Sequence, residues 1–185
     1  MIYANLNINR RGRILPAAWL VVFLLLCMPR AVAQDAPSRA YQLKAAFLFN
    51  FTQFVEWPQQ AFSNSKEPFV IGVLGNNPFG DYLQQVVNGE SWKSHPIVVR
   101  NFRTNREAAN SHILFITEGA SVGMASFRKK PILTVSDAHD FAERGGVVEF
   151  YTVENKIRLR INRRVAREAG LNISSKLLRL ADIRN

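Results

Sequence analysis

The sequence predicts an α/β protein, a three-layer sandwich whose mostly parallel sheet is flanked by helices and ends in a C-terminal antiparallel hairpin. Short apolar segments recur between residues 69 and 153, and such segments are typical of strands buried on both faces. Segments with helical spacing separate them, as the connections between parallel strands require. Residues 156–161 instead alternate basic and apolar side chains, which indicates a half-exposed antiparallel strand at the sheet edge.

Residues 1–33 have the pattern of a cleaved secretory signal peptide. Three arginines lie within residues 10–13, residues 17–26 are apolar, and Ala-Val-Ala at residues 31–33 fits the small-x-small cleavage motif. The apolar run is about half as long as a bilayer-spanning helix. We therefore expect cleavage after this motif, export to the periplasm, and one mature domain at residues 34–185.

Charge and cysteine content narrow the functional classes. The chain has 24 basic and 14 acidic residues; four basic residues and no acidic one precede the expected cleavage site, which leaves the mature domain a net charge of +6. Cys27 lies in the signal segment, so the mature domain has neither a disulfide nor a thiolate metal site. Residues 156–184 are rich in basic side chains, and such a face suits nucleic acid, anionic lipid or an acidic protein. Because we expect export, we expect no nucleic-acid partner.

The first expected helix covers residues 38–57, from a Ser38 cap to the residue before Pro58. Its apolar side chains occupy more than one face, so it needs cover on two sides. We expect part of this helix, with Phe51 and Trp57, to form a contact with a second copy or with a protein partner.

The remaining elements alternate between strand and helix. Strands are expected at residues 69–74, 97–102, 112–117, 131–135, 147–153 and 156–161. Helices are expected at residues 78–87, 105–110, 122–128, 138–144, 163–169 and 174–181.

Polar residues follow three of the expected parallel strands. Ligands of open α/β sheets bind beyond the carboxyl ends of the strands. The residues there form a candidate ligand pocket: Asn76, Asn77, Glu118 and Asp137.

A second candidate site lies on the C-terminal hairpin. Arg158 and Arg160 alternate with apolar residues, and Glu149 and Phe150 lie on the neighbouring strand. Arginine beside exposed apolar groups is typical of a protein-binding patch. The alternative is that these charges only protect an edge strand from aggregation.

Catalysis has little support in the sequence. Asp137 and His139 could serve as a general base, but an aspartate where a strand gives way to a helix is better explained as a helix cap. Ser174 before Lys176 is likewise better explained as a cap than as a nucleophile.

The other two histidines, His95 and His112, have no partner at metal-ligand spacing. We therefore expect no catalytic residues, no metal and no cofactor, and predict a non-enzymatic domain that binds a partner.

An ordered set of short motifs then resembles one known family. These motifs are KAAFLFN at 44–50, FVEWP at 54–58, IGVLG at 71–75, PFGD at 78–81, HILFI at 112–116, LTVSD at 133–137, RGG at 144–146, RIN at 160–162 and ISSKLLRLA at 173–181. Together they resemble the YfiR/HmsC-like family over nearly the whole mature chain, from about Tyr41 to Ile183.

The resemblance implies a periplasmic repressor that binds the sensor domain of an inner-membrane diguanylate cyclase and lowers cyclic di-GMP and biofilm formation. It also implies a homodimer and release by an outer-membrane YfiB-like lipoprotein or by envelope stress. The runner-up hypothesis is a periplasmic sensor of a small ligand. The best-known members of the family carry disulfide-forming cysteines, one of them commonly just before the HILFI-like strand, whereas this chain has Ser111 there. Disulfide-based redox control is therefore excluded for the mature chain.

Overall fold

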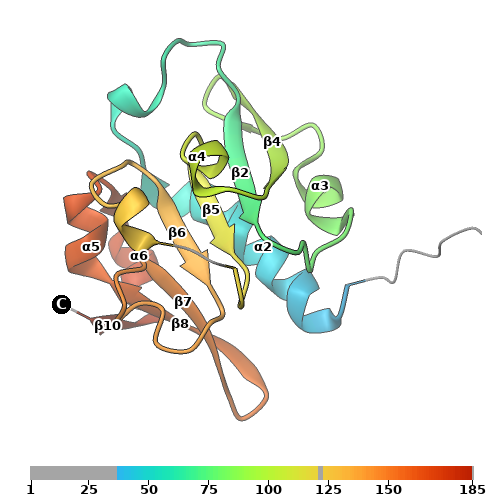
Figure 1. Cartoon of the computed structure of the whole chain (residues 1–185), viewed down its shortest axis with the longest axis vertical. Coiled ribbons are helices and arrows are strands. Elements are labelled where there is room, and N and C mark those ends of the chain that lie inside the picture. The colour runs from blue at the N-terminus through green and yellow to red at the C-terminus, as the bar shows by residue number, and fades with distance from the viewer. Residues whose placement is uncertain (1–36, 121–122, 185) are drawn as a thin grey trace, which may run out of the picture. The chain divides into compact units, whose positions relative to one another are not determined.

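The computed structural model describes residues 37–120 and 123–184, so the expected signal peptide lies outside the described residues. Eight strands form one sheet in the order β10-β8-β7-β6-β5-β2-β4-β3 (Figure 1). Their bounds are β2 Phe69–Leu74, β3 Ser91–Trp92, β4 His95–Phe102, β5 Ile113–Ile116, β6 Leu133–Ser136, β7 Val148–Val153, β8 Lys156–Asn162 and β10 Ala181–Arg184. Within this sheet, only the β7–β8 and β3–β4 pairs are antiparallel. The predicted mostly parallel α/β sheet with a C-terminal hairpin is confirmed.

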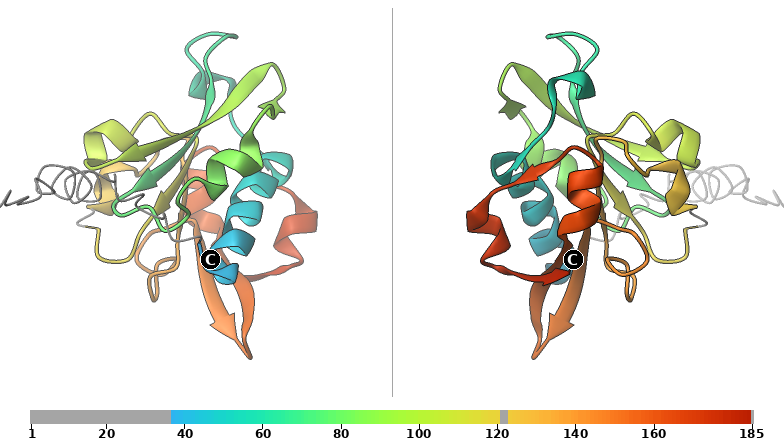
Figure 2. Two further views of the ribbon diagram at one scale, coloured as in Figure 1. Left: turned by 90° about the vertical axis from the view of Figure 1, so that its right-hand side faces the viewer. Right: turned by 90° about the vertical axis from the view of Figure 1, so that its left-hand side faces the viewer.

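Helices flank this sheet. They are α2 Arg39–Phe54, α3 Tyr82–Val87, α4 Asn105–Ala108, α5 Arg163–Glu168 and α6 Ser175–Leu178, with 3₁₀ turns η1 Gln59–Ala61 and η2 Met124–Ser126. The long helix α2 crosses one face of the sheet (Figures 1 and 2).

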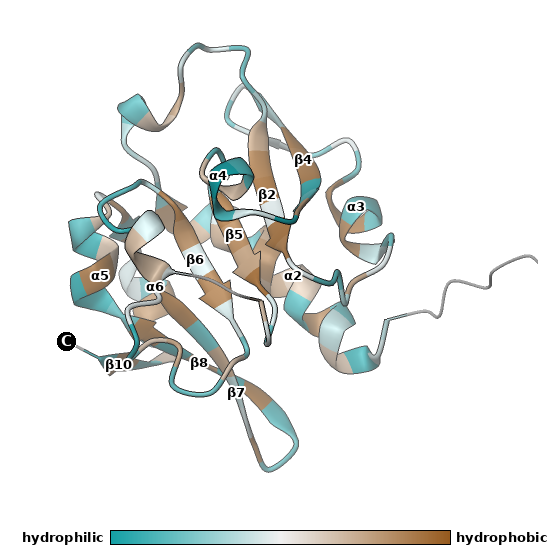
Figure 3. Cartoon of the chain, viewed as in Figure 1, coloured by the Kyte–Doolittle hydropathy of each residue, from teal (hydrophilic) through white to brown (hydrophobic). Residues whose placement is uncertain are grey.

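The apolar side chains of the strands divide between two cores. The larger core joins α2 to one face, where Phe51 packs with Phe115 and Phe150 among others. Leu114 and Ile116 lie in the second core, together with Ala108 of α4. Because successive strand residues point to opposite faces, both faces bury apolar groups, and the central strands are mostly brown in Figure 3. This is the burial that their continuous apolar sequence predicts.

The first helix is shorter than predicted. It ends at Phe54, and Val55–Glu56 forms strand β1, which pairs antiparallel with β9, Asn172–Ile173. The backbone N–H of Ser174 donates to the carbonyl of Phe54 at 2.8 Å, which anchors the end of the helix. Residues 55–56 form a strand because their pairing partner lies 116 residues further along the chain. The spacing of apolar residues within the helix carries no information about such a distant partner.

The predicted edge position of residues 156–161 is wrong. Strand β10 pairs parallel with β8, with Asp182 opposite Arg160, so β10 forms the edge. The expected helix 174–181 is also wrong in its second half: α6 ends at Leu178 and β10 begins at Ala181. The Ser174 cap is confirmed, because its side-chain oxygen accepts from the N–H of Leu177 at 3.3 Å.

Two further predicted helices are absent or reduced. Residues 138–144 form turns, and Asp140 has φ of +57°, a left-handed conformation that a helix does not accommodate. Of the expected helix 122–128, the structure describes the 3₁₀ turn η2, and residue 122 lies outside the described residues. None of the helices within residues 37–120 and 123–184 has both the length and the apolar character to span a bilayer.

Candidate functional site

A buried ion pair lies beyond the carboxyl end of β6. Asp137 directly follows this strand, and its Oδ2 lies 2.5 Å from Nζ of Lys44 on α2. The two side chains are only 13 % and 11 % exposed. The hydroxyl of Tyr41 donates to the same Oδ2 at 2.9 Å. Asp137 is therefore an acceptor for two groups of α2, and the predicted capping role is wrong because no helix follows it.

The phenol of Tyr41, which donates to this carboxylate, has a raised pKa. Burial raises the pKa of its phenol to about 12, and the hydrogen bond to Asp137 and the negative charges of Asp137 and Glu118 act in the same direction. The phenol therefore stays protonated, and remains a donor to Asp137, at physiological pH.

A second ion pair joins β7 to β8. Glu149 and Arg160 are cross-strand partners, and Arg160 Nη1 donates to Glu149 Oε1 at 2.8 Å. The other oxygen of Glu149 accepts from the backbone N–H of Ala142 at 3.1 Å, while Arg160 Nε donates to Asp182 at 3.3 Å. Burial acts to lower the pKa of Arg160, but the two carboxylates outweigh it and raise that pKa. Both partners are thus held in place on the sheet.

These two ion pairs line one hollow of about 460 Å³. The lining residues come from α2, from the segments after β5 and β6, and from the hairpin: Lys44, Glu118, Asp137, His139, Glu149, Phe150, Tyr151, Thr152 and Arg160. We call this hollow the charged pocket. Fixed charges of both signs suit a polar or zwitterionic group, because each charge of such a ligand finds an opposite charge on the wall.

The structure divides the predicted ligand pocket. Glu118 and Asp137 both line the charged pocket, whereas Asn76 and Asn77 are not among its lining residues. The Asn77 side chain instead closes a turn: its Oδ1 accepts from the N–H of Phe79 at 2.9 Å and its Nδ2 donates to the carbonyl of Gly80 at 3.1 Å. Such local bonding is a common role for asparagine before a short helix.

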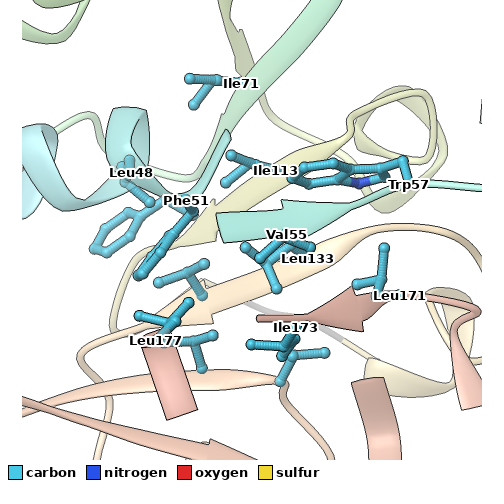
Figure 4. Close-up of a cluster of buried hydrophobic side chains, with 14 of the residues drawn as sticks. Leu48, Phe51, Val55, Trp57, Ile71, Ile113, Leu133, Leu171, Ile173 and Leu177 are labelled. Carbon is cyan, nitrogen blue, oxygen red and sulfur yellow. The ribbon is translucent and has the colours of Figure 1, made fainter. Parts of the chain in front are cut away.

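Most of the predicted partner-binding residues are inaccessible. Phe51, Trp57 and Phe150 are 1 %, 5 % and 2 % exposed, and Phe51 and Trp57 point into the apolar cluster of Figure 4. These three side chains are therefore buried within the domain and do not lie on an open contact surface. Glu149 is buried too, and Arg160 is held by two carboxylates. Arg158 alone of the predicted set is exposed.

Lys44 and Tyr41 are site residues that the sequence reasoning missed. The available signal was a lysine at helical spacing from Leu48 and Phe51, on the face that α2 buries. A charged residue on such a face requires a partner of opposite charge.

His112 and His95 have structural roles. His112 Nδ1 accepts from the N–H of Val70 at 3.0 Å, and Nε2 lies 3.2 Å from the carbonyl of Ala61, so the ring is neutral with its proton on Nε2. Burial is the main cause of the lowered pKa of His112. Phe62 stacks between His112 and His95, with ring centroids 4.4 and 4.1 Å away.

His139 differs, since its side chain is 90 % exposed and contacts Asp140 at 2.8 Å. In the described part of the chain, no group of three or more His, Cys, Asp or Glu is arranged to hold a metal ion.

Comparison with known proteins identifies the family. The sequence model described as YfiR/HmsC-like matches residues 41–182, from within α2 to within β10, and this range includes every residue that lines the charged pocket. No curated protein matches the chain. This family is regulatory rather than catalytic, is periplasmic in general, and acts in diguanylate cyclase signalling. The chain belongs to the YfiR/HmsC-like family.

Proposed function

We propose that this protein is exported by a cleaved signal peptide and represses an inner-membrane diguanylate cyclase by binding its periplasmic sensor domain. Repression lowers cyclic di-GMP and biofilm formation. The observation that carries this proposal is the family match over residues 41–182, which covers nearly all of the described domain. We further propose that the repressor is a homodimer and that an outer-membrane YfiB-like lipoprotein releases it.

The free tip of the β7–β8 hairpin is the surface that we propose for the cyclase. It projects beyond the rest of the sheet (Figure 1). Val153 is 46 % exposed there, and Lys156 and Arg158 are exposed beside it. Glu154 and Asn155 close the turn with φ of +49° and +61°, the left-handed conformations of a tight two-residue hairpin. The exposed apolar Val153 and the basic Lys156 and Arg158 beside this turn suit an acidic protein partner.

The test is intracellular cyclic di-GMP in the host after deletion of the gene and complementation with the exported protein. Deletion should raise cyclic di-GMP, and the wild-type protein should restore it. The variant Arg158→Glu should complement poorly, since a reversed charge opposes an acidic partner. Lys66→Glu makes the same charge change in an exposed loop and should complement fully. An unchanged cyclic di-GMP level after deletion would refute repression, and full complementation by Arg158→Glu would refute only the hairpin surface.

A second candidate function is sensing of a small ligand in the charged pocket. Its support is the concentration of charged side chains around one hollow, with Asp137 and Glu149 both largely buried. Buried ion pairs are costly to desolvate and contribute little net stability, so a set of them around a pocket favours a binding role. A screen of zwitterionic metabolites by thermal shift tests this function, and a ligand should lose its effect in Glu118→Gln, which removes a charge from the pocket wall. Stabilisation that persists in this variant would place the ligand elsewhere.

A further inference from the structure

A second hollow, separate from the charged pocket, is lined by η2, by residues of β6 and of the segment that joins it to β7, and by α5. Its volume is about 320 Å³. This is near the lower end of the range of roughly 300–1,000 Å³ that small-molecule sites occupy. None of its lining residues belongs to the charged pocket.

The floor of this hollow is apolar and deeply buried. Phe127, Ile132 and Val147 line it and are 4 %, 2 % and 1 % exposed. The one polar group of the buried floor, the hydroxyl of Thr134, already accepts from the N–H of Val147 at 3.1 Å. The floor is therefore mainly apolar and offers contacts to an apolar group.

The rim carries more positive than negative charge. Arg128, Lys129, Arg144 and Arg164 face two acidic residues, Glu143 and Glu168. Glu168 is shared, with one oxygen 2.7 Å from Arg164 and the other 3.9 Å from Arg128.

The other rim carboxylate is also engaged. Glu143 lies 3.6 Å from Arg184 on the edge strand β10. Lys129 and Arg144 make no ion pair with any residue in 37–120 or 123–184. Lys129 and Arg144 are therefore two cations at the rim that can pair with an anionic ligand.

We propose that this hollow is a binding site for a small organic anion with an apolar body, such as a medium-chain carboxylate. The apolar body fills the floor over Ile132 and Val147. The carboxylate lies at the rim between Lys129 and Arg144. A purely inorganic anion leaves the floor unfilled, and a neutral apolar molecule leaves the two cations unmatched, so the site selects molecules that have both parts.

Both rim cations lie in tight turns of the backbone. Lys129 has φ of +58°, and Gly145, next to Arg144 and itself part of the lining, has φ of +98°. Both turns are left-handed conformations that an extended or helical segment lacks.

The test uses octanoate as the probe, with octanol and acetate as matched controls. Octanol keeps the apolar chain without the charge, and acetate keeps the charge without the chain. Calorimetric titration of the purified protein should give one saturable site for octanoate and at least tenfold weaker binding of both controls. Methyl chemical-shift changes should centre on Ile132 and Val147.

Variants then assign the anion to the rim. Lys129→Gln and Arg144→Gln should each weaken octanoate binding about fivefold, the loss expected for one partly exposed charge pair. Lys66→Gln removes an exposed cation from the loop before β2, outside both pockets, and should leave binding unchanged. Equal binding of octanol, unaltered binding in both rim variants, or the absence of saturable octanoate binding up to about 10 mM would overturn the proposal. The octanoate titration tests this pocket alone, and its outcome does not depend on whether the protein represses a diguanylate cyclase.

Discussion

Lys44 and Asp137 are 93 residues apart in sequence, yet their charged atoms lie 2.5 Å apart. The pair ties the helix that covers one face of the sheet to the segment that follows β6. Because both side chains are nearly buried, the interaction is only weakly screened by solvent.

We predict that Lys44→Met lowers the free energy of unfolding by about 3 kcal/mol, since it leaves a buried carboxylate without its cation. Chemical denaturation measures the effect. The exposed-loop variant Lys66→Met should change stability by less than about 0.5 kcal/mol. Asp137→Asn in the Lys44→Met background should cost much less than it does alone, because the pair is already broken. Additivity of the two changes within about 0.5 kcal/mol would contradict the coupling.

His112 should make the protein less stable in acid. Burial holds its pKa below the usual value of about 6.5, and His95 and Glu67 are the nearby titratable groups that also act on it. As the pH falls below about 6.5, the unfolded state binds a proton that the folded state refuses, so the free energy of unfolding decreases. Above that pH the contribution is fully present. Urea unfolding between about pH 7.5 and pH 5 measures the slope.

The variant His112→Phe isolates this effect. Phenylalanine retains the stacking on Phe62 but leaves the N–H of Val70 without an acceptor, which should cost about 1–3 kcal/mol at neutral pH. The acid slope should also become shallower. His139→Gln alters an exposed ring and should reproduce the wild-type profile. A wild-type slope in His112→Phe would show that another group titrates.

Ser111 offers a route to greater stability. Its hydroxyl is the only buried side-chain N or O atom within residues 37–120 and 123–184 that has no hydrogen-bond partner. Ser111→Ala removes an unsatisfied polar group and should raise the free energy of unfolding by about 1 kcal/mol. Ser136→Ala is the matched control, since that buried hydroxyl donates to Ile116 at 2.7 Å and accepts from Ala138 at 3.1 Å. It should destabilise the protein, and equal effects of the two changes would refute this account.

Gly146 lies too close to an aromatic ring for any side chain. A Cβ added there would lie 2.1 Å from the ring of Phe141. Gly146→Ala should therefore destabilise the domain by about 1–3 kcal/mol through displacement of Phe141 from the second core. Gly123→Ala introduces a Cβ with nothing within 4 Å at an ordinary φ of −81° and should be nearly neutral. A thermal melt of the two variants compares them directly, and equal melting temperatures would contradict the prediction.

The candidate site could be predicted only in part. Glu118 and Asp137 were identified because they follow expected parallel strands, and the sheet does bring both to one pocket. Glu149 and Arg160 were identified as a surface patch, but they line the same pocket from an interior position. The alternation of basic and apolar residues predicts that one face of β8 is polar, but it does not show whether a further strand pairs with β8. Strand β10 provides that cover, and Asp182 engages Arg160 from it.

The sequence by itself determined which segments form the central strands, because continuous apolar runs and their spacing are local properties that persist in any packing. It also determined the family, through motifs spread from residue 41 to residue 182. Tertiary structure alone decided that α2 ends at Phe54, that β10 rather than β8 forms the edge, and that Lys44 meets Asp137. Each of these depends on a partner far away along the chain, whose free energy of pairing outweighs the local preference of the segment.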